Sequence, residues 1–284
     1  MIDLQAHLMG VLDTESLTLT PLSGGDVAQA FAVRRTDGSV VFAKTHATAP
    51  PGFFVTEATG LAWLRDADAV PIPEVVHVSD DPPVLVLEWI PPGNAHADTE
   101  EELGRALAAL HAAGAPSFGR EDRRSTGSRG LPNEPCDTWA EFYATNRLLP
   151  LAKLATDGRA LAASTVDEIE AVAGRLDDLG GPPEPPARLH GDLWAGNRVI
   201  AEGGQSWLID PAAHGGHREF DLAMMRLFGG FGDACFAAYA EVHPLADGWE
   251  DRVPLHHLAP LIVHAIKFGG GYAAATERAL AALR

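Results

Sequence analysis

The stretch RLHGDLWAGNRVI, residues 188–200, places polar residues on a short segment between two apolar runs. His190, Gly191 and Asp192 end the first run, and Asn197 follows Asp192 by five positions. A Gly-Asp turn between two strands, capped by the amide of Asn197, is the simplest explanation. These residues alone do not decide between such a turn and a functional loop, so the flanking sequence has to be considered with them.

The spacing of Asp192 and Asn197 is also that of the kinase catalytic loop. In such a loop Asp192 would orient a substrate hydroxyl for attack on the γ-phosphate of ATP, and Asn197 would hold a divalent cation. Residues 197–201 and 205–210 are predicted to form a hairpin, which brings Asp210 back beside Asn197. Carboxylate and amide oxygens are the ligands that Mg²⁺ prefers. We therefore expect Asn197 and Asp210 to bind Mg²⁺.

The first 90 residues predict a five-stranded sheet with one helix inserted after the third strand. The turns SGGD and TDG separate the first three strands, and the helix has apolar residues at helical spacing. A short helix is expected before the sheet. The expected elements are a helix at 2–12, strands at 16–22, 27–35, 39–46, 73–81 and 82–90, and the inserted helix at 53–67.

Lys44 lies on the third predicted strand, and Glu57 follows it thirteen residues later, near the start of the inserted helix. Kinases use a lysine on this strand to contact the α- and β-phosphates and a glutamate on the next helix to hold it. A lone lysine between apolar runs could simply extend its amine to solvent. The combination with Asp192, Asn197 and Asp210 favours the kinase interpretation.

Nucleotide-binding positions are also expected at two further places. Gly24 and Gly25 lie between the first two strands, where backbone N–H groups could face a phosphate, although an ordinary hairpin turn explains them equally well. Residues about 88–94, which include the breaker cluster PPGN, form a candidate hinge. Backbone groups there are expected to bind the adenine edge, and the positions that we assign by this argument are Glu88, Trp89 and Ile90.

The remaining residues are mainly helical in pattern. We expect helices at 98–113, about 137–156, about 160–179 and 218–228, with several more to the end, and a polar loop at 118–135. The predicted fold is therefore α+β with two lobes: a small N-terminal antiparallel β lobe with one helix, residues 1–90, and a larger helical lobe, residues 91–284.

The assembled residues resemble the kinase-like phosphotransferases that act on small molecules. Within the aminoglycoside-phosphotransferase and protein-kinase-like fold, the chain is most similar to the fructosamine kinase (ketosamine kinase) family. Gly191 replaces the arginine of protein kinases, Asp210 is followed by Pro, and no A-P-E segment occurs. The matching stretches are LSGGDVAQAF, TEATGLAWL, LHGDLWAGN and IDPAAHGGHREFDLAMMRLFGGF.

This resemblance implies ATP-dependent phosphorylation of a sugar hydroxyl on ketosamines, which are adducts of a sugar with an amine. It makes Asp192 the base and Asn197 and Asp210 the Mg²⁺ ligands, with Lys44 on the phosphates of ATP and held by Glu57. It also implies that Asp221 anchors the backbone of the catalytic loop, where a favourable first-turn acid of a helix is the alternative.

Two residues are expected to contact the substrate. Trp194 lies two positions after the expected base, so its ring should lie near the attacking hydroxyl, unless it packs inward and steadies the loop. His214 follows Asp210 closely and is expected to border the substrate site.

Two other functions remain open from the sequence. An aminoglycoside, choline or other amino-alcohol phosphotransferase would use the same catalytic loop and the same Asp210. A non-catalytic nucleotide-binding module would not require the base Asp192.

Composition excludes several classes of partner. Asp and Glu number 39 against 21 Lys and Arg, and the formal net charge of −18 argues against nucleic acid and anionic membranes. The first ten residues lack the pattern of a signal peptide, and no run reaches the ~18 apolar residues of a membrane span. We expect a cytoplasmic protein with a small-molecule or glycated-amine substrate, and we favour a monomer.

From the sequence we expect no metal site at the cysteines or the histidines. Cys136 and Cys235 are far apart and are expected to be unpaired thiols. The clusters HGGH, residues 214–217, and HH, residues 256–257, each lack a convincing third ligand.

Overall fold

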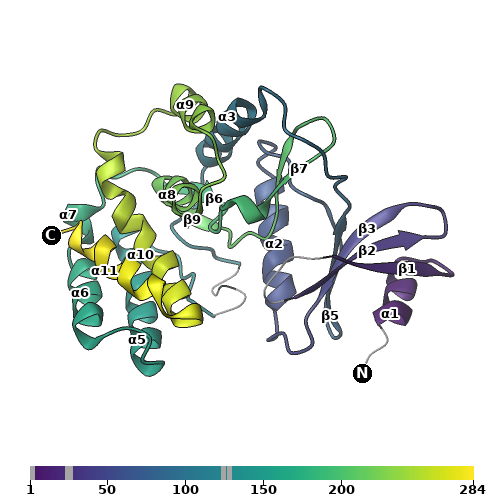
Figure 1. The fold of residues 1–284 in the computed structure, drawn as a ribbon, viewed down its shortest axis with the longest axis horizontal. Helices are drawn as coiled ribbons and strands as arrows, with labels where there is room; N and C mark the ends of the chain where they lie inside the picture. The colour runs from purple at the N-terminus through teal and green to yellow at the C-terminus, as the bar shows by residue number, and fades with distance from the viewer. Residues whose placement is uncertain (1–3, 23–27, 123–125, 127–129) are drawn as a thin grey trace.

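The computed structural model describes residues 4–22, 28–122, 126 and 130–284, and these form two lobes (Figure 1). The sheet lobe contains all five strands of one antiparallel sheet, which confirms the predicted α+β, protein-kinase-like arrangement. Its elements are α1 (Leu4–Val11), β1 (Leu17–Leu22), β2 (Gln29–Arg35), β3 (Val40–Thr45), α2 (Phe53–Arg65), β4 (Val75–Asp80) and β5 (Pro83–Glu88).

The order of the strands is β1-β2-β3-β5-β4, so β3 and β5 are inner strands. Alternate residues of β5 face opposite sides of the sheet: Val84 and Val86 pack with α1, whereas Leu85 and Leu87 pack with α2. Lys44 pairs in register with Leu85, which places it on the α2 side of the sheet. The sheet therefore presents Lys44 to the helix that carries Glu57.

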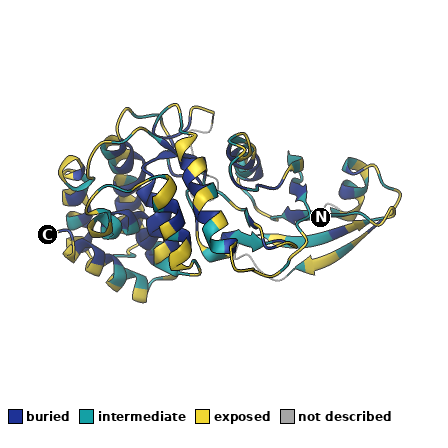
Figure 2. Ribbon diagram, turned by 90° about the horizontal axis from the view of Figure 1, so that it is seen from above, coloured by how far each residue is buried: buried dark blue, intermediate teal, exposed yellow. Residues whose placement is uncertain are grey.

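The helical lobe contains most of the remaining elements, and Figure 2 shows their buried faces turned inward. They are α3 (Thr99–Ala112), α4 (Trp139–Tyr143), α5 (Leu149–Asp157), α6 (Ala163–Ala173), α7 (Leu176–Leu179), β6 (Ala187–Leu189), β7 (Arg198–Ile200), β8 (Ser206–Leu208), β9 (His214–Gly216), α8 (Glu219–Phe228), α9 (Asp233–Val242), α10 (Trp249–Phe268) and α11 (Gly271–Ala281). No helix of the described residues is long and apolar enough to cross a membrane.

Two of the expected helices are divided. The helix expected at about 137–156 is α4 and α5 joined by a π-helical turn over Ala144–Leu148. This turn lies next to Pro150, which has no N–H to donate at the start of α5. The backbone N–H of Leu149 donates to the carbonyl of Ala144, five residues earlier, as in a π-helix. The helix expected at about 160–179 is α6 and α7, separated at Gly174, which caps α6.

Two small antiparallel pairs, β6–β9 and β7–β8, support the segment that the sequence singled out. The β7–β8 hairpin was expected, whereas β9 was not. A side chain at Gly215 in β9 would collide with the carbonyl of Ser117, so only glycine permits this close approach. The histidine-containing stretch 214–217 thus begins as a buried strand.

The connection from β5 to α3 is fastened to the β7–β8 hairpin. The N–H of Gly93 donates to the carbonyl of Ile200, and the N–H of Glu202 donates to the carbonyl of Pro91. We propose that the lobe boundary lies here, at residues about 88–94. A further bond, at 2.6 Å, joins Arg188 in β6 to the carbonyl of Trp63 in α2 and connects the two lobes.

Candidate active site

The loop between β6 and β7 turns sharply at Gly191. Its φ of 80° lies in the left-handed region, and a Cβ at this position would collide with the carbonyl of Ala212. Protein kinases usually have arginine at this position of the motif, but the backbone of this chain admits only glycine without strain. The turn places Asp192 where the two lobes meet.

Asp221 lies in the first turn of α8, and its side chain fixes the backbone of the loop at Gly191. Its carboxylate accepts hydrogen bonds from the N–H groups of His190, at 2.7 Å, and Gly191, at 2.9 Å. His111 lies 3.3 Å away and contacts the hydroxyl of Tyr239 through its other nitrogen. Burial opposes ionisation of Asp221, but His111 and the backbone donors lower its pKa below the usual value. These bonds favour the anchoring role over that of a simple helix-end charge.

Asp221→Asn should destabilise the protein by roughly 2–3 kcal/mol, because the new amide presents N–H to a backbone N–H and leaves a buried donor unsatisfied. Thermal unfolding should show the melting temperature falling by several degrees. Asp233→Asn is the matched control, since Asp233 is an exposed acid in the first turn of α9. Equal melting temperatures for the two variants would contradict the anchoring role.

Asp192, Asn197 and Asp210 are tied together by one side-chain amide. Nδ2 of Asn197 donates to the backbone carbonyl of Asp192 at 2.9 Å, to its carboxylate at 3.1 Å and to the carbonyl of Asp210 at 3.3 Å. The predicted proximity of the three residues is therefore present. Burial raises the pKa of Asp192 to about 7, against the opposing effect of the Asn197 hydrogen bond.

Lys44 joins the two lobes. Its ammonium lies 2.7 Å from Glu57 and also contacts the carboxylate of Asp210. Burial raises the pKa of Glu57 to about 8, whereas Lys44 lowers the pKa of Asp210 despite the burial of that carboxyl. The expected Lys44–Glu57 pair is present, and the same ammonium also neutralises Asp210.

The donor set fits a hard cation. Asp210 stands at a φ of 54°, a backbone conformation that Asp tolerates better than most residues. Its side chain is 47% exposed, whereas those of Lys44 and Glu57 are 9% and 11% exposed. Because Nδ2 of Asn197 is directed at its carbonyl partners, Oδ1 is the atom that remains for a metal. A carboxylate and an amide oxygen are suitable Mg²⁺ ligands.

The three expected adenine-binding positions differ in whether their backbone groups already make hydrogen bonds within the protein. The N–H of Glu88 donates to the carbonyl of Glu74, and its carboxylate accepts from the N–H of Glu74. Trp89 and Ile90 make no hydrogen bond to another described residue. Backbone groups at 89–90 therefore suit a nucleotide base better than those of Glu88. Gly24 and Gly25 lie outside the described residues.

The two expected substrate residues are placed differently. Trp194 is 40% exposed, and its ring lies against the backbone of Gly196 and edge-on to Phe228. His214 is buried, stacks on Phe142 at 5.3 Å and bonds through Nδ1 to the carbonyl of Ala212. Burial lowers the pKa of His214 to about 3. This placement favours support of the loop by His214 rather than the expected contact with substrate.

The structure supplies the third polar group that the histidine clusters lacked in sequence. His217, Glu219 and His256 bring one potential ligand atom each to within 4.8 Å of one another. Arg252 already donates to both oxygens of Glu219, at 2.6 and 2.9 Å. The N–H of Glu219 donates to Nδ1 of His217, which leaves the proton on Nε2 of the neutral ring. We therefore describe this group as a buried ion-pair cluster.

Sequence reasoning missed Lys267 and a set of rings beside the loop. Lys267 lies in the last turn of α10, and its charge opposes part of the rise that burial causes in the pKa of Asp192. Phe228 and Phe268 each end a helix and precede two glycines, so the repeated FGG at 228–230 and 268–270 was a signal.

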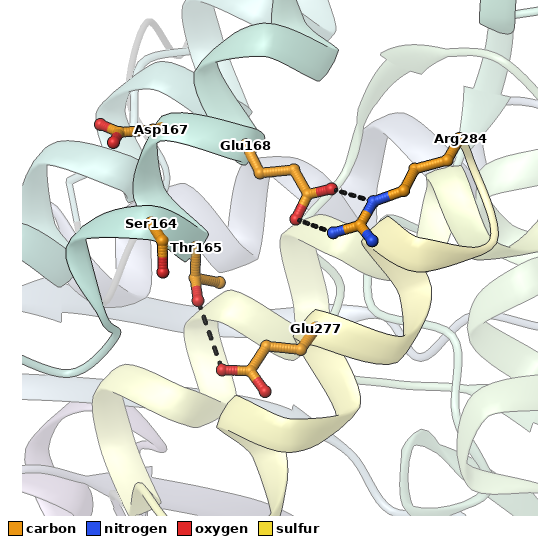
Figure 3. Close-up of a pocket in the computed structure, with 6 residues that line it drawn as sticks. All are labelled: Ser164, Thr165, Asp167, Glu168, Glu277 and Arg284. Carbon is orange, nitrogen blue, oxygen red and sulfur yellow. Dashed lines mark hydrogen bonds and ion pairs between the residues drawn. The ribbon is translucent and has the colours of Figure 1, made fainter.

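A hollow between α6 and α11 lies apart from these residues (Figure 3). Two contacts cross it: Arg284 donates to Glu168 at 2.7 and 3.0 Å, and Thr165 donates to Glu277. It contains none of the residues of the candidate active site.

Comparison with known proteins agrees with the geometry. A family model described as fructosamine kinase matches residues 5–284. The chain is 33% identical over 261 residues to a probable ketoamine kinase of Enterococcus faecium, covering 92% of this chain and 93% of that protein. It is 32% identical over 258 residues to the chloroplastic protein-ribulosamine 3-kinase of Arabidopsis thaliana, covering 88% and 77%.

Solved structures give the same result. A putative fructosamine-3-kinase from Thermobifida fusca superposes with a TM-score of 0.91 at 39% identity, covering 99% of this chain and 98% of that one. An aminoglycoside phosphotransferase in complex with AMP-PNP and hygromycin B has a TM-score of 0.66 at 17% identity, covering 100% and 98%. The second likeness shows the fold alone.

Proposed function

Because the chain belongs to the fructosamine kinase family, and is thus a phosphotransferase acting on a hydroxyl group, we propose that it transfers the γ-phosphate of ATP to a sugar hydroxyl of a ketosamine. The observation that carries this proposal is the convergence of Asp192, Asn197, Asp210 and Lys44 at the junction of the lobes. The names of the relatives, ribulosamine 3-kinase and fructosamine-3-kinase, lead us to propose the hydroxyl on carbon 3.

Asp192 acts as the base in this proposal. Its carboxylate accepts the proton of the attacking hydroxyl and orients the oxygen lone pair toward the phosphorus. A pKa near 7 suits this task, since a base is most effective when its pKa is close to the working pH. Asn197 and Asp221 keep the carboxylate in place through the bonds described above.

Asn197 and Asp210 would hold Mg²⁺, which when bound neutralises charge on the phosphate oxygens. Lys44 contacts the α- and β-phosphates, and Glu57 fixes the direction of its amine. Lys44 also contacts the carboxylate of Asp210. Backbone groups of Trp89 and Ile90 bind the adenine edge.

All of these residues belong to one chain, so a monomer is sufficient for the reaction. We propose that the protein works as a monomer in the cytoplasm on small-molecule or glycated-amine substrates.

Trp194→Leu should raise KM for the ketosamine about 2- to 30-fold and leave KM for ATP nearly unchanged. An indole face accommodates the C–H face of a sugar or a cationic amine, and a cation over Trp contributes about 0.5–2 kcal/mol. Steady-state kinetics with each substrate varied in turn measures both constants. An unchanged ketosamine KM together with a marked fall in melting temperature would show that Trp194 is a structural residue.

The proposal is tested by a panel of acceptors with ATP and Mg²⁺, in which ADP release is measured. The panel contains a fructose adduct, a ribulose adduct, the parent amines, an aminoglycoside and choline. The highest kcat/KM is expected for a ketosamine. Preference for the aminoglycoside or choline would assign the chain to amino-alcohol phosphorylation, and ATP binding without transfer to any acceptor would indicate a nucleotide-binding module.

A further inference from the structure

The carboxylate of Glu100, in the first turn of α3, joins two segments that lie far apart in the chain. Its Oε1 accepts a hydrogen bond from Nη1 of Arg198 at 2.6 Å, and its Oε2 accepts one from the backbone N–H of Gly232 at 2.7 Å. Arg198 begins β7, directly after the proposed metal ligand Asn197, and Gly232 ends the connection between α8 and α9, residues 229–232. We call this connection the 229–232 loop, and Glu100 links it to β7.

Arg198 is held on several sides by this part of the molecule. Its side chain is only 4% exposed, its Nε donates to the hydroxyl of Ser206 at 3.0 Å, and its guanidinium lies 5.4 Å from the centroid of the Phe231 ring in the 229–232 loop. A buried guanidinium is strongly destabilising unless its charge is paired, and Glu100 supplies the opposite charge. The ion pair therefore reaches the loop twice, at Phe231 and at Gly232.

The 229–232 loop packs directly against the catalytic loop. Gly230 has a φ of 89°, and a Cβ at this position would collide with the Cβ of Ala195, which follows Trp194. Phe228, the last residue before the 229–232 loop, has its ring 6.0 Å from that of Trp194 and edge-on to it. A displacement of this loop would therefore change the surface beside Trp194, the residue that we expect to contact the substrate.

The helix that carries Glu100 is itself fixed to both neighbours. α3 lies beside α9 (Figure 1), and a Cβ at Gly104 of α3 would collide with the carbonyl of Cys235 in α9. At the start of α3, the hydroxyl of Thr99 donates to the carbonyl of Gly204, in the turn between β7 and β8, at 2.8 Å. The first turn of α3 is thus a rigid base from which one carboxylate can hold the 229–232 loop in place.

We propose that Glu100 and Arg198 are positioning residues for the ketosamine: they hold the 229–232 loop, and with it Phe228, against Trp194. The inference rests on the proposed function, in which the substrate lies at the catalytic loop beside Trp194. Neither Glu100 nor Arg198 touches the substrate in this proposal, and both act through the surface that the loop forms.

The groups that we assign to ATP and Mg²⁺ are held independently of this pair. The amide of Asn197 donates to the backbone carbonyls of Asp192 and Asp210, and Lys44 is held by Glu57 from the sheet lobe. Loss of the pair should therefore raise KM for the ketosamine and leave KM for ATP nearly unchanged.

The test measures steady-state kinetics with the fructose adduct of glycine, ATP and Mg²⁺, each substrate varied in turn, well below the melting temperature of every protein. The variants are Glu100→Gln, in which the side chain keeps one acceptor oxygen instead of two, Arg198→Met and Arg198→Lys. Glu101→Gln is the matched control, because Glu101 lies in the same turn of α3, is 46% exposed and pairs with Arg105 on the helix surface. The double variant Glu100→Gln/Arg198→Met leaves no unpaired charge and is measured beside the single variants, so that the test does not depend on a protein that folds poorly.

Glu100→Gln, Arg198→Met and the double variant should raise KM for the ketosamine about 3- to 20-fold, because a charge-assisted hydrogen bond is lost but acts on the substrate only through the loop. KM for ATP should change less than about 2-fold. Arg198→Lys keeps the positive charge and should give a smaller rise than Arg198→Met, whereas Glu101→Gln should match the wild type. In a Trp194→Leu background, Glu100→Gln should have little further effect on the ketosamine KM, since both changes act at one surface.

An unchanged ketosamine KM, equal rises in both Michaelis constants, or additive effects of Glu100→Gln and Trp194→Leu would overturn the inference and leave the proposed function standing. A lower melting temperature with both Michaelis constants unchanged would show that the pair is only structural. Absence of turnover of every ketosamine by the wild type would overturn the proposed function and, with it, this inference.

Discussion

Asp192→Asn should reduce kcat by about 10²–10⁴-fold, equivalent to roughly 3–5 kcal/mol of transition-state stabilisation. The amide has nearly the same shape as the carboxylate but cannot accept the proton of the attacking hydroxyl. The backbone carbonyl of residue 192 still accepts from Asn197, so the loop should keep its conformation. Phosphate transfer to a ketosamine at saturating ATP measures the effect.

The control is Asp157→Asn. Asp157 is an exposed residue at the end of α5, and its carboxylate pairs with Lys153. Both variants should melt close to the wild-type temperature and bind ATP with Mg²⁺. If Asp192→Asn turns over at the wild-type rate on the best substrate, another group must be the base.

Asp210→Asn should nearly abolish transfer, with a loss on the order of 10³-fold, because it removes the charged oxygen ligand of a metal that contributes several kcal/mol. Asn is chosen because, like Asp, it tolerates the left-handed conformation of residue 210, whereas Ala would add backbone strain. Calorimetric ATP binding at increasing Mg²⁺ concentration should show a weaker dependence on the metal than in the wild type.

Asp221→Asn provides the comparison for this experiment. Its carboxylate binds the backbone of the catalytic loop, so its loss should lower stability and leave the Mg²⁺ titration of ATP binding unchanged. If the Asp210 and Asp221 variants give the same titration, the roles that we propose for them are wrong.

The core of the candidate site could be predicted from the sequence because its parts are local. Asp192 and Asn197 share one loop, and a short hairpin returns the chain to Asp210. The pairing of Lys44 with Glu57 could be predicted from the order of the strands and the helix. The period-two pattern of the strand and the helical pattern that follows it place both side chains on the same side of the sheet. The family resemblance then added the substrate class.

Features that depend on packing between distant segments could not be predicted in this way. His214 is close to Asp210 in sequence, but β9 turns its ring under the loop against Phe142. Lys267 and Phe268 are 75 and 76 residues after Asp192 in the chain, and they reach the catalytic loop only because α10 packs on α8. The third member of the His217–Glu219–His256 cluster likewise comes from a different helix.

Identification of the phosphorylated product is the most direct test of the central claim, that this chain is a ketosamine kinase. The protein is incubated with ATP, Mg²⁺ and the fructose adduct of glycine, and the product is quantified by mass spectrometry and ³¹P NMR. The account predicts one phosphorylated ketosamine for each ADP formed, with the phosphate on a sugar hydroxyl. ADP formed without phosphorylated ketosamine, or phosphate found only on a non-glycated amino alcohol, would contradict it.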